Sequence, residues 1–486
     1  MKDNARKVLL LLLSWLAFVV SGSAVRPDGF SDVRGEAVVE AARKYKGRPY
    51  RYGTAGPNVF DCSGFTSFIF DKFGVSLSRD SRAQYRQGVS VGREALHEGD
   101  LVFFTSPRSG RSVGHVGIVS KVEDDGNFYF VHAARRGVTE DSYRASSYYS
   151  NRYVGARRVI EDKDTLSVAM CGDIMMGTTY PSVQLPENDG QDIFLDTREL
   201  TLRADIALGN MEGAITDAGH CTKGSGPNSY AFRMPTRFGH LLGEAGYDYL
   251  SQANNHANDF DTEGILSTEQ VLEQQGIRFS GIAGRTESSV VERDGIRYGI
   301  CAFGHNSYTL KHQDLTTVKR IIDDLKGKSD IVIVSFHGGA EGRDKRHLPM
   351  GTEIFLGEDR GNLREFTHFC IDSGADVVFG HGPHVCRAME VYKGRFIAYS
   401  LGNFCTPYGM SLTGISGYSP VVTIRIDREG RFLDGKIHSF IQQKGVGPRK
   451  DDSCAVAREI KELTESDIQG SPIRISSEGD ISLADE

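Results

Sequence analysis

The hydrophobic pattern in the first third of the chain changes from helical to strand-like spacing. Apolar residues recur at helical intervals over residues 36–45 and again over residues 62–73, where Gly74 supplies a stop. Four runs rich in β-branched and aromatic residues follow, and they predict strands at residues 101–104, 113–120, 128–133 and 153–160. Helices followed by a run of strands are typical of an α+β domain, which we expect to span residues 34–160.

Beyond a polar stretch at residues 161–164, which we expect to be a linker, apolar runs alternate with helical patterns. The predicted strands are residues 166–171, 205–209, 248–252, 298–303, 331–336 and 376–379. The predicted helices are residues 236–245, 262–275, 315–325 and 361–373. This alternation favours a layered α/β domain with a central sheet over residues 165–445. Residues 446–486 are expected to form a polar, acidic tail with one short helix at residues 455–463.

The first residues have the pattern of an export signal. Lys2, Arg6 and Lys7 precede an apolar run over residues 8–20, and small residues follow at 21–24. The run is shorter than the roughly 20 residues that a membrane-spanning helix needs. We therefore expect residues 1–24 to be a signal peptide and the protein to be exported, to the periplasm, the cell envelope or the outside. Membrane association is expected only if this segment stays uncleaved.

Composition indicates a globular protein, with 39% hydrophobic and 25% charged residues over 486 positions. A chain of this length is longer than one that folds around a single hydrophobic core, so two or three domains are expected. Residues 34–162 carry 20 Lys and Arg against 15 Asp and Glu, a balance that suits an anionic polymer such as cell wall. The whole chain has a net charge of −7 and no recognisable nucleic-acid-binding module, so nucleic acid is not an expected partner.

One cysteine and two histidines stand in the order that a thiol hydrolase requires. Cys62 lies at the first turn of its predicted helix, where unpaired N–H groups and the helix dipole stabilise a thiolate. His115 and His132 lie on two later predicted strands. We expect His115 to act as the base and His132 to hydrogen-bond its other ring nitrogen and fix the tautomer. Each residue alone has an ordinary structural explanation, but the set as a whole favours catalysis.

The motifs around these residues resemble those of the NlpC/P60 cysteine peptidases over residues 36–160. The similar segments are PYRYG at 49–53, FDCSGF at 60–65, EGDLVFF at 98–104, GHVGIV at 114–119 and FVHA at 130–133. The resemblance implies a papain-like α+β fold without a cofactor. It also implies cleavage of cell-wall peptides, commonly at the γ-D-glutamyl–diaminopimelate bond.

The same resemblance implies catalytic roles for Cys62, His115 and His132 and substrate-binding roles for Tyr50, Asp61 and Ser63. Tyr50 matches a tyrosine that helps to shape the oxyanion and substrate site. Asp61 and Ser63 match positions that in some members bind the amine of an N-terminal L-Ala, and Asp61 has the alternative role of a helix cap. The segment SRDS at 78–81 departs from the usual Pro-Arg-Thr or Pro-Arg-Ser, which leaves the role of Arg79 open.

Polar residues follow five of the strands predicted in the second domain. The motifs are GDIMMG at 172–177, GNMEG at 209–213, ANNHA at 253–257, SFHGG at 335–339 and GHGPHV at 380–385. Carboxylate, amide and imidazole groups that converge at one sheet edge suit a hydrolytic divalent-metal site. The candidate ligands are Asp173, Glu212, Asn254, His256, His337, His381 and His384. Singly, each could be a loop hydrogen-bonder or a core histidine, whereas the whole set favours a metal.

Together with YSLGNF at 399–404, these motifs resemble the CapA/PgsA family, which is linked to poly-γ-glutamate capsule synthesis, over residues 165–410. The resemblance implies a four-layer α/β sandwich related to calcineurin-like metallophosphoesterases. Asn254 and His256 match the family's Asn-His motif, and His381 and His384 match its terminal histidine pair. Met175 stands where phosphoesterases have the histidine of Asp-x-His, which leaves one metal position and phosphatase activity open.

Three interpretations of the whole chain follow. The leading one is an exported cell-envelope cysteine endopeptidase that hydrolyses γ-D-glutamyl–diaminopimelate-type bonds and carries a CapA-like metal-dependent domain. In the second, the CapA-like domain dominates and the protein is a poly-γ-glutamate or capsule factor. In the third, that domain is a non-catalytic polymer-binding module. The expected partners are peptidoglycan stem peptides or a γ-glutamyl polymer, and the identity of the metal stays open.

Overall fold

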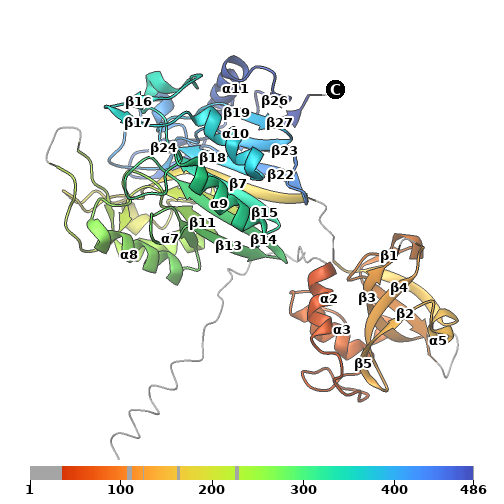
Figure 1. The fold of residues 1–486 in the computed structure, drawn as a ribbon. Coiled ribbons are helices and arrows are strands. Elements are labelled where there is room, and N and C mark those ends of the chain that lie inside the picture. Colours follow the sequence, from red (N-terminus) through yellow and green to blue (C-terminus); the bar gives the residue numbers. More distant parts are fainter. Residues whose placement is uncertain (1–34, 107–111, 124, 161–164, 225–228, 485–486) are drawn as a thin grey trace, which may run out of the picture. The chain divides into compact units, whose positions relative to one another are not determined.

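The computed structural model describes residues 35–106, 112–123, 125–160, 165–224 and 229–484 (Figure 1). The chain divides into two compact units, of which the first includes Pro27–Asp164 and the second includes Thr165–Val291 and Arg297–Glu486. The predicted signal peptide at 1–24 and the predicted linker at 161–164 lie outside the described residues. Within the described ranges, no helix has the length and apolar character needed to cross a bilayer.

The first unit packs helices against one antiparallel sheet (Figure 1). The helices are α2 (Gly35–Arg43), α3 (Cys62–Asp71), α4 (Ser81–Gln84), η1 (Arg93–Ala95) and α5 (Ser147–Ser150). The strand order is β1-β6-β2-β3-β4-β5. Its strands are β1 (Val89–Val91), β2 (Leu101–Thr105), β3 (Val113–Val122), β4 (Phe128–Ala134), β5 (Gly137–Ser142) and β6 (Tyr153–Arg158). This is the α+β arrangement that the sequence predicts, with two additional strands, β1 and β5.

Helix α3 begins at the partly buried Cys62, and Ser63, Gly64 and most of the residues that follow are buried. Phe65, Ile69 and Phe70 are fully buried in the core beneath the sheet. The side chain of Asp61 caps the helix, because its Oδ1 accepts a hydrogen bond from the Gly64 N–H at 2.8 Å. A Cβ at Gly64 would lie 2.2 Å from the Thr54 carbonyl oxygen, so only glycine fits this close approach. These contacts fix the position of Cys62 at the start of the helix.

The second unit contains two mixed sheets rather than one central sheet. The larger sheet has the order β12-β11-β8-β7-β22-β23-β27-β26, with β21 beside β7. Its strands are β7 (Thr165–Ile174), β8 (Ile206–Met211), β11 (Tyr249–Ser251), β12 (Arg278–Ser280), β21 (Asn403–Cys405), β22 (Val421–Asp427), β23 (Phe432–His438), β26 (Ile473–Ile475) and β27 (Asp480–Leu483). The smaller sheet has the order β13-β14-β15-β18-β20-β19. Its strands are β13 (Ser288–Arg293), β14 (Ile296–Phe303), β15 (Ile331–His337), β18 (Val377–His381), β19 (Met389–Tyr392) and β20 (Arg395–Ala398).

Helices of the second unit pack on separate hydrophobic cores. The helices are α6 (Arg198–Arg203), α7 (Gly239–Glu244), α8 (Asp261–Gln274), α9 (Leu315–Lys326), α10 (Leu363–Ser373) and α11 (Ala455–Asp467). Leu242 of α7 and Leu272 of α8 join the core of the larger sheet. Val318 of α9 and Phe366 of α10 join that of the smaller sheet. The predicted alternation of strands and helices is therefore observed, whereas the four-layer metallophosphoesterase arrangement stays a prediction.

Short elements complete the second unit. Three two-stranded pairs are β9 (Ala214–Ile215) with β10 (Arg233–Met234), β16 (Ile354–Phe355) with β17 (Glu358–Asp359), and β24 (Phe440–Gln443) with β25 (Gly447–Lys450). The short 3-10 helices are η2 (Glu187–Gly190), η3 (Thr236–Phe238), η4 (Arg343–Lys345) and η5 (Gly414–Gly417).

The predicted tail at residues 446–486 contains strands in addition to the one short helix that the sequence indicates. After the predicted helix, which is observed as α11, strand β27 pairs with β23 on one side and with β26 on the other. Ile473, Ile475 and Ile481 are buried although the residues around them are polar. A strand with one buried face needs an apolar residue only at every second position. The mean composition of such a segment can therefore be polar, and the sequence did not reveal these strands.

Candidate active site and candidate metal centre

Cys62 lies in a cleft of the first unit together with all three residues predicted to bind substrate. Tyr50, Asp61 and Ser63 line this hollow of about 420 Å³ with Cys62. A second hollow, of about 920 Å³, is lined by His115 and shares Tyr50 and Gly114 with the first. The nucleophile candidate and the base candidate therefore lie in adjoining hollows of one surface.

A backbone hydrogen bond connects Cys62 with β3, the strand that carries His115. The backbone N–H of Val116, which follows His115 on β3, hydrogen-bonds to Cys62 and lowers the pKa of its thiol, as does the N–H of Ser63. Burial is the largest influence, however, and together with the nearby charge of Asp61 it raises the pKa of Cys62 to about 11. The N–H groups that the sequence predicts to favour a thiolate are thus present, and desolvation of the thiol opposes them.

The two histidines form a hydrogen-bonded pair across neighbouring strands. Nε2 of His115 on β3 lies 2.7 Å from Nδ1 of His132 on β4, as predicted for a base and its orienting partner. Nε2 of His132 lies 2.9 Å from Oδ2 of Asp141 on β5. Asp141 in turn forms an ion pair with Arg136. Burial lowers the pKa of His115 well below its usual value and also lowers that of His132.

Asp141 is a candidate functional residue that the sequence did not reveal. It lies on β5, whose residues after Gly137 and Val138 are mostly polar and lack the alternation that predicts a strand. The only available signal was a carboxylate nine residues after His132, beyond a turn at Arg135 and Arg136. Spacing of that kind is common without any functional meaning.

Both oxygens of Asp61 are occupied by donors from the protein. Oδ1 accepts from Gly64 N and from Nη1 of Arg79, both at 2.8 Å, and Oδ2 accepts from Gly53 N and from Nη2 of Arg79, both at 2.7 Å. The Ser63 hydroxyl donates to the Arg79 carbonyl oxygen at 2.7 Å. The capping role of Asp61 is thus observed, whereas the predicted binding of an amine by Asp61 and Ser63 would require one of these donors to move away.

The seven predicted metal ligands gather where parallel strands of both sheets end. They are Asp173 near the end of β7, Glu212 after β8, Asn254 and His256 after β11, His337 at the end of β15, His381 at the end of β18, and His384 after it. In the parallel registers Asp173 lies beside Asn210, and His337 lies beside His381. The carboxyl ends of parallel strands are where open sheets place their sites.

Distances among these side chains define a compact cluster. Asp173, Glu212 and His337 offer ligand atoms that all lie within 4.8 Å of one another. Nδ1 of His384 lies 2.9 Å from Oδ2 of Asp173, and Nδ1 of His381 lies 3.7 Å from its Oδ1. Nε2 of His256 is farther away, at 4.0 Å from Oε1 of Glu212. The structure therefore brings the predicted carboxylates and imidazoles together.

Asn254 is engaged in hydrogen bonds within the cluster. Its Nδ2 donates to Oδ1 of Asn210 at 3.0 Å and to the Met211 carbonyl at 2.8 Å, and its Oδ1 accepts from His256 N at 3.0 Å. Asn210, which the sequence did not single out, donates to both Asp173 and Glu212 at 2.8 and 2.7 Å. Its signal was its place in the motif at 209–213, at the end of a strand.

Buried atoms of the cluster lack hydrogen-bond partners in a way that fits a cation. Among the described residues these atoms include Oε1 of Glu212 and both ring nitrogens of His337 and His381. A buried polar atom without a partner costs about 1–3 kcal/mol. Burial raises the pKa of Glu212 well above its usual value, and the nearby charge of Asp173 adds to this effect. A divalent cation would supply a partner to Oε1 of Glu212 and to one ring nitrogen of each histidine, so the residues fit the metal that the motifs imply.

A further histidine packs against the cluster. The ring of His305 stacks on that of His337 at 5.9 Å, and its Nδ1 lies 3.4 Å from the His337 carbonyl oxygen. His305 lies two residues after the end of β14 at Phe303, so it occupies the same kind of position as the predicted ligands.

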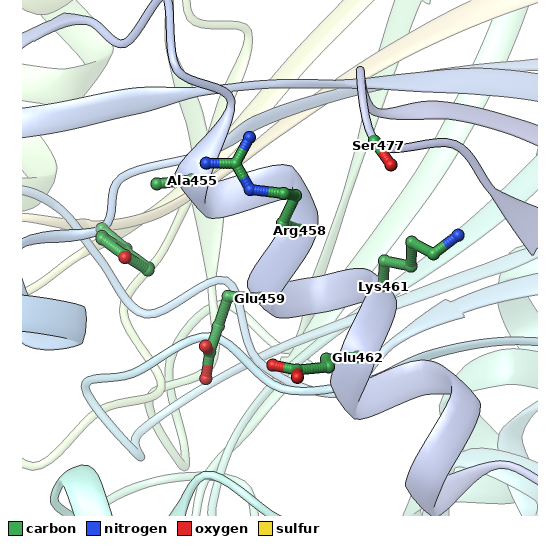
Figure 2. A pocket seen from close by; sticks show the side chains of 7 residues that line it. Ala455, Arg458, Glu459, Lys461, Glu462 and Ser477 are labelled. Atoms are coloured by element: carbon green, nitrogen blue, oxygen red, sulfur yellow. The ribbon is translucent and has the colours of Figure 1, made fainter.

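Another hollow, of about 410 Å³, lies along α11 (Figure 2). Arg458 and Lys461 alternate there with Glu459 and Glu462 on the same helix. Glu459 is ion-paired with Arg346 at 2.7 Å. No predicted site residue lines this hollow, and its charges of both signs favour no particular ligand.

The fold and the two sites define a protein of two parts, one with the side chains of a thiol hydrolase and one with those of a metal centre. Residues 47–158 match the model of the NlpC/P60 family, and residues 167–408 match that of the bacterial capsule synthesis protein PGA_cap. The chain therefore joins an NlpC/P60 peptidase-family domain to a CapA-like domain.

Individual relatives match one part each. The PGA biosynthesis protein CapA of Bacillus subtilis is 27% identical over 318 residues, which cover 62% of this chain and 78% of that protein. The "Probable endopeptidase p60" of Listeria grayi is 37% identical over 112 residues, 23% of this chain and only 20% of that protein. A crystal structure of an NlpC/P60 family protein from Bacillus cereus is 32% identical, with a TM-score of 0.24, and the match covers 26% of this chain and 41% of that one.

Proposed function

We propose that this protein is an exported cysteine endopeptidase of the cell envelope, cleaving γ-D-glutamyl–diaminopimelate-type bonds in peptidoglycan peptides. The observation that carries the proposal is the hydrogen-bonded pair of His115 and His132, 2.7 Å apart, on strands beside the Cys62 cleft. The peptidase domain is assigned to residues 34–160. Export is inferred from the predicted signal peptide at residues 1–24.

In the proposed reaction, His115 takes the thiol proton as the Cys62 sulfur attacks the γ-glutamyl carbonyl carbon. The C–N bond then breaks, His115 returns the proton to the leaving amine, and the acyl group remains on the sulfur as a thioester. Water, deprotonated by His115, attacks the thioester and releases the carboxylate together with the Cys62 thiol. Burial raises the pKa of the Cys62 thiol and lowers that of the His115 imidazole, and both directions favour a proton transfer that accompanies formation of the S–C bond.

A small excess of positive charge around the cleft, four arginines against three aspartates, supports an anionic peptide as substrate. Arg79 and Arg82 line the hollow with Cys62, and Arg135 and Arg136 line the hollow with His115. Three of these arginines are paired with carboxylates: Arg79 with Asp61, Arg82 with Asp80 and Arg136 with Asp141. Stem peptides and γ-glutamyl polymers both carry free α-carboxylates, so either would meet this surface favourably.

We infer further that the CapA-like domain binds a divalent cation and has the four-layer arrangement of metallophosphoesterases. Asp173, Glu212, His256, His337, His381 and His384 would hold the ion, and Asn254 would orient the cluster through its hydrogen bonds. Such an ion supplies activation of water and neutralisation of a developing oxyanion. The unpartnered nitrogens of His337 and His381 are the support for this inference.

The test is mass spectrometry of muropeptides and of poly-γ-glutamate after digestion by the full chain. The wild type is expected to split stem peptides after the γ-glutamyl residue, and Cys62→Ala is expected to release no product. Cys221→Ala, which changes a partly exposed cysteine of the second unit, serves as the matched control and is expected to cleave normally. Cleavage of stem peptides by Cys62→Ala at the wild-type rate would overturn the proposal.

In a second candidate function, the main activity of the protein belongs to the CapA-like domain. That domain would act either as a poly-γ-glutamate or capsule factor or as a polymer-binding module without turnover. The observation that favours it is the extent of the CapA match, which covers 62% of this chain. Under this alternative, His256→Ala would change the products from poly-γ-glutamate while cleavage of stem peptides stays normal. Binding without turnover would leave the polymer uncut by every variant.

A further inference from the structure

We propose that Asp141 sets the tautomers of both His132 and His115, so that Nδ1 of His115 is the atom that accepts the Cys62 proton. The inference rests on the proposed function, because it assumes that His115 is the base. Asp141 is a positioning residue in this account, acting on the reacting atoms only through the two rings.

The directions of the two hydrogen bonds in the series His115–His132–Asp141 follow from its last member, the Asp141 carboxylate. An ionised carboxylate only accepts, so the hydrogen between His132 Nε2 and Asp141 Oδ2, 2.9 Å apart, belongs to His132. A neutral imidazole with its proton on Nε2 has a lone pair on Nδ1. The 2.7 Å contact with His115 therefore requires the proton on Nε2 of His115. This leaves Nδ1 of His115 with the lone pair that a general base needs.

The environment disfavours a second proton on either ring. Burial lowers the pKa of His115 well below its usual value, and a positive charge on His132 would lower it further. Burial also lowers the pKa of His132, although the hydrogen bond to Asp141 opposes this effect. Tyr149 covers both rings, at 5.8 Å from His115 and 5.1 Å from His132.

Asp141 itself is held in the ionised form. The hydrogen bond with His132 is the largest influence and lowers the pKa of Asp141, burial opposes it, and the charges of His132 and Arg136 lower the pKa further. Arg136 occupies Oδ1, which leaves Oδ2 for His132. The charged groups that face the histidine pair in the described residues are thus Asp141 and Arg136.

An ordinary surface ion pair is the competing explanation. The side chain of Arg136 is 63% exposed, and exposed pairs contribute little to stability. The side chain of His132 is completely buried, however, and Asp141 is the partner of its Nε2. A role in stability alone would not move the proton positions on the rings, so those positions separate the two explanations.

The experiment is ¹⁵N NMR of the histidine rings in the full chain, with Asp141→Asn and Arg136→Gln as variants. In the wild type we expect His115 and His132 to carry their protons on Nε2. In Asp141→Asn, Arg136 holds the amide oxygen and the NH₂ group faces His132, so both protons are expected to move to Nδ1. The value of kcat for stem peptides should then fall on the order of 100-fold with KM little changed, and Asp141→Glu should restore part of it. Arg136→Gln, which leaves a carboxylate at 141, is expected to keep the wild-type tautomers.

Two results would overturn the inference. One is a proton on Nδ1 of His115 in the wild type, a measurement that needs no variant. The other is Asp141→Asn with unchanged tautomers and kcat. These outcomes are distinct from failure of the proposed function, which would show as full activity of Cys62→Ala whatever the tautomers are.

Discussion

Arg79 holds both carboxylate oxygens of Asp61, with Nη1–Oδ1 and Nη2–Oδ2 distances of 2.8 and 2.7 Å. Bidentate pairs of this kind combine charge with a fixed geometry. Because Gly53 and Gly64 occupy the remaining acceptor positions, the carboxylate has no open site for another donor. The sequence left the role of Arg79 open, and the structure gives it a partner beside the candidate nucleophile.

The Arg79–Asp61 pair predicts how cleavage depends on whether the N-terminal amine of the substrate is free. With Asp61 occupied, we expect stem peptides with a free and with an acetylated L-Ala amine to be cleaved with kcat/KM values within about threefold of each other. Arg79→Ala frees one acceptor position on each oxygen of Asp61. A single hydrogen bond to a charged group is worth about 1.5–3 kcal/mol, so preference for the free amine should rise about 10-fold or more.

The matched control is Arg82→Ala, which removes an exposed arginine of the same cleft that is paired with Asp80 instead. It is expected to leave the ratio unchanged. A strong preference of the wild type for the free amine, lost in Asp61→Asn, would show that Asp61 binds the amine despite Arg79.

The buried thiol predicts how alkylation of Cys62 depends on pH. Burial raises the pKa of Cys62 to about 11, so the thiolate fraction should grow as pH rises toward that value. We expect the rate of iodoacetamide labelling, followed by mass spectrometry of the peptide that contains Cys62, to increase about tenfold per pH unit between pH 7 and 9. A rate that is already constant below pH 7 would indicate a thiolate–imidazolium pair in the free protein.

The cluster at the strand ends predicts stoichiometric binding of a divalent cation. Elemental analysis of the full chain, equilibrated with Mn²⁺ or Zn²⁺ and then dialysed, should find at least one ion per chain. Asp173→Asn removes a charged ligand and should lower the content, and chelation should lower the melting temperature of the wild type, because a bound ion stabilises the folded state.

His240→Ala is the control for this measurement, since His240 is an exposed histidine on α7 outside the predicted ligand set. Its metal content should equal that of the wild type. Equal content in Asp173→Asn and the wild type would place any bound ion elsewhere.

An ion-pair network in the peptidase domain predicts an acid-sensitive contribution to stability. Glu140 on β5 accepts from Arg43 at the end of α2, from Lys46 and from Ser120, at 2.8–2.9 Å. Burial raises the pKa of Glu140, but these hydrogen bonds outweigh it and lower the pKa from 4.5 to about 2. A depressed pKa contributes stability that is present above pH 4.5 and is lost as pH falls toward 2.

Glu140→Gln should therefore destabilise the full chain by about 1 kcal/mol at pH 7, with the difference shrinking as pH falls toward 2. Urea titrations at several pH values, monitored by a probe in the first unit, measure the effect. A difference that is the same at pH 7 and at pH 3 would contradict an electrostatic origin.

The catalytic residues could be predicted because they lie in local sequence motifs. Contacts that depend on how distant strands pair could not be predicted. Cys62, His115 and His132 sit in strong motifs on elements with clear periodicity, so their convergence was predictable. Asp141 was missed because β5 is polar, and its contact with His132 depends on strand register rather than on any local signal.

In the second unit, too, the pairing of distant strands could not be predicted from local sequence patterns. Strand ends were predictable from alternating patterns, and with them the positions of Asp173, Glu212 and His337. Their division between two sheets was not, because β7 pairs with β22 and β8, while β15 pairs with β14 and β18. Pairing over such sequence distances is set by tertiary packing.

The most direct test of the central claim is the rate of product release from a γ-glutamyl–diaminopimelate peptide by the purified full chain and by Cys62→Ala, measured by liquid chromatography and mass spectrometry. We predict cleavage at that bond by the wild type and none by the variant, whose folding is checked by its melting temperature. A folded Cys62→Ala protein that releases the same product at the wild-type rate would contradict the account.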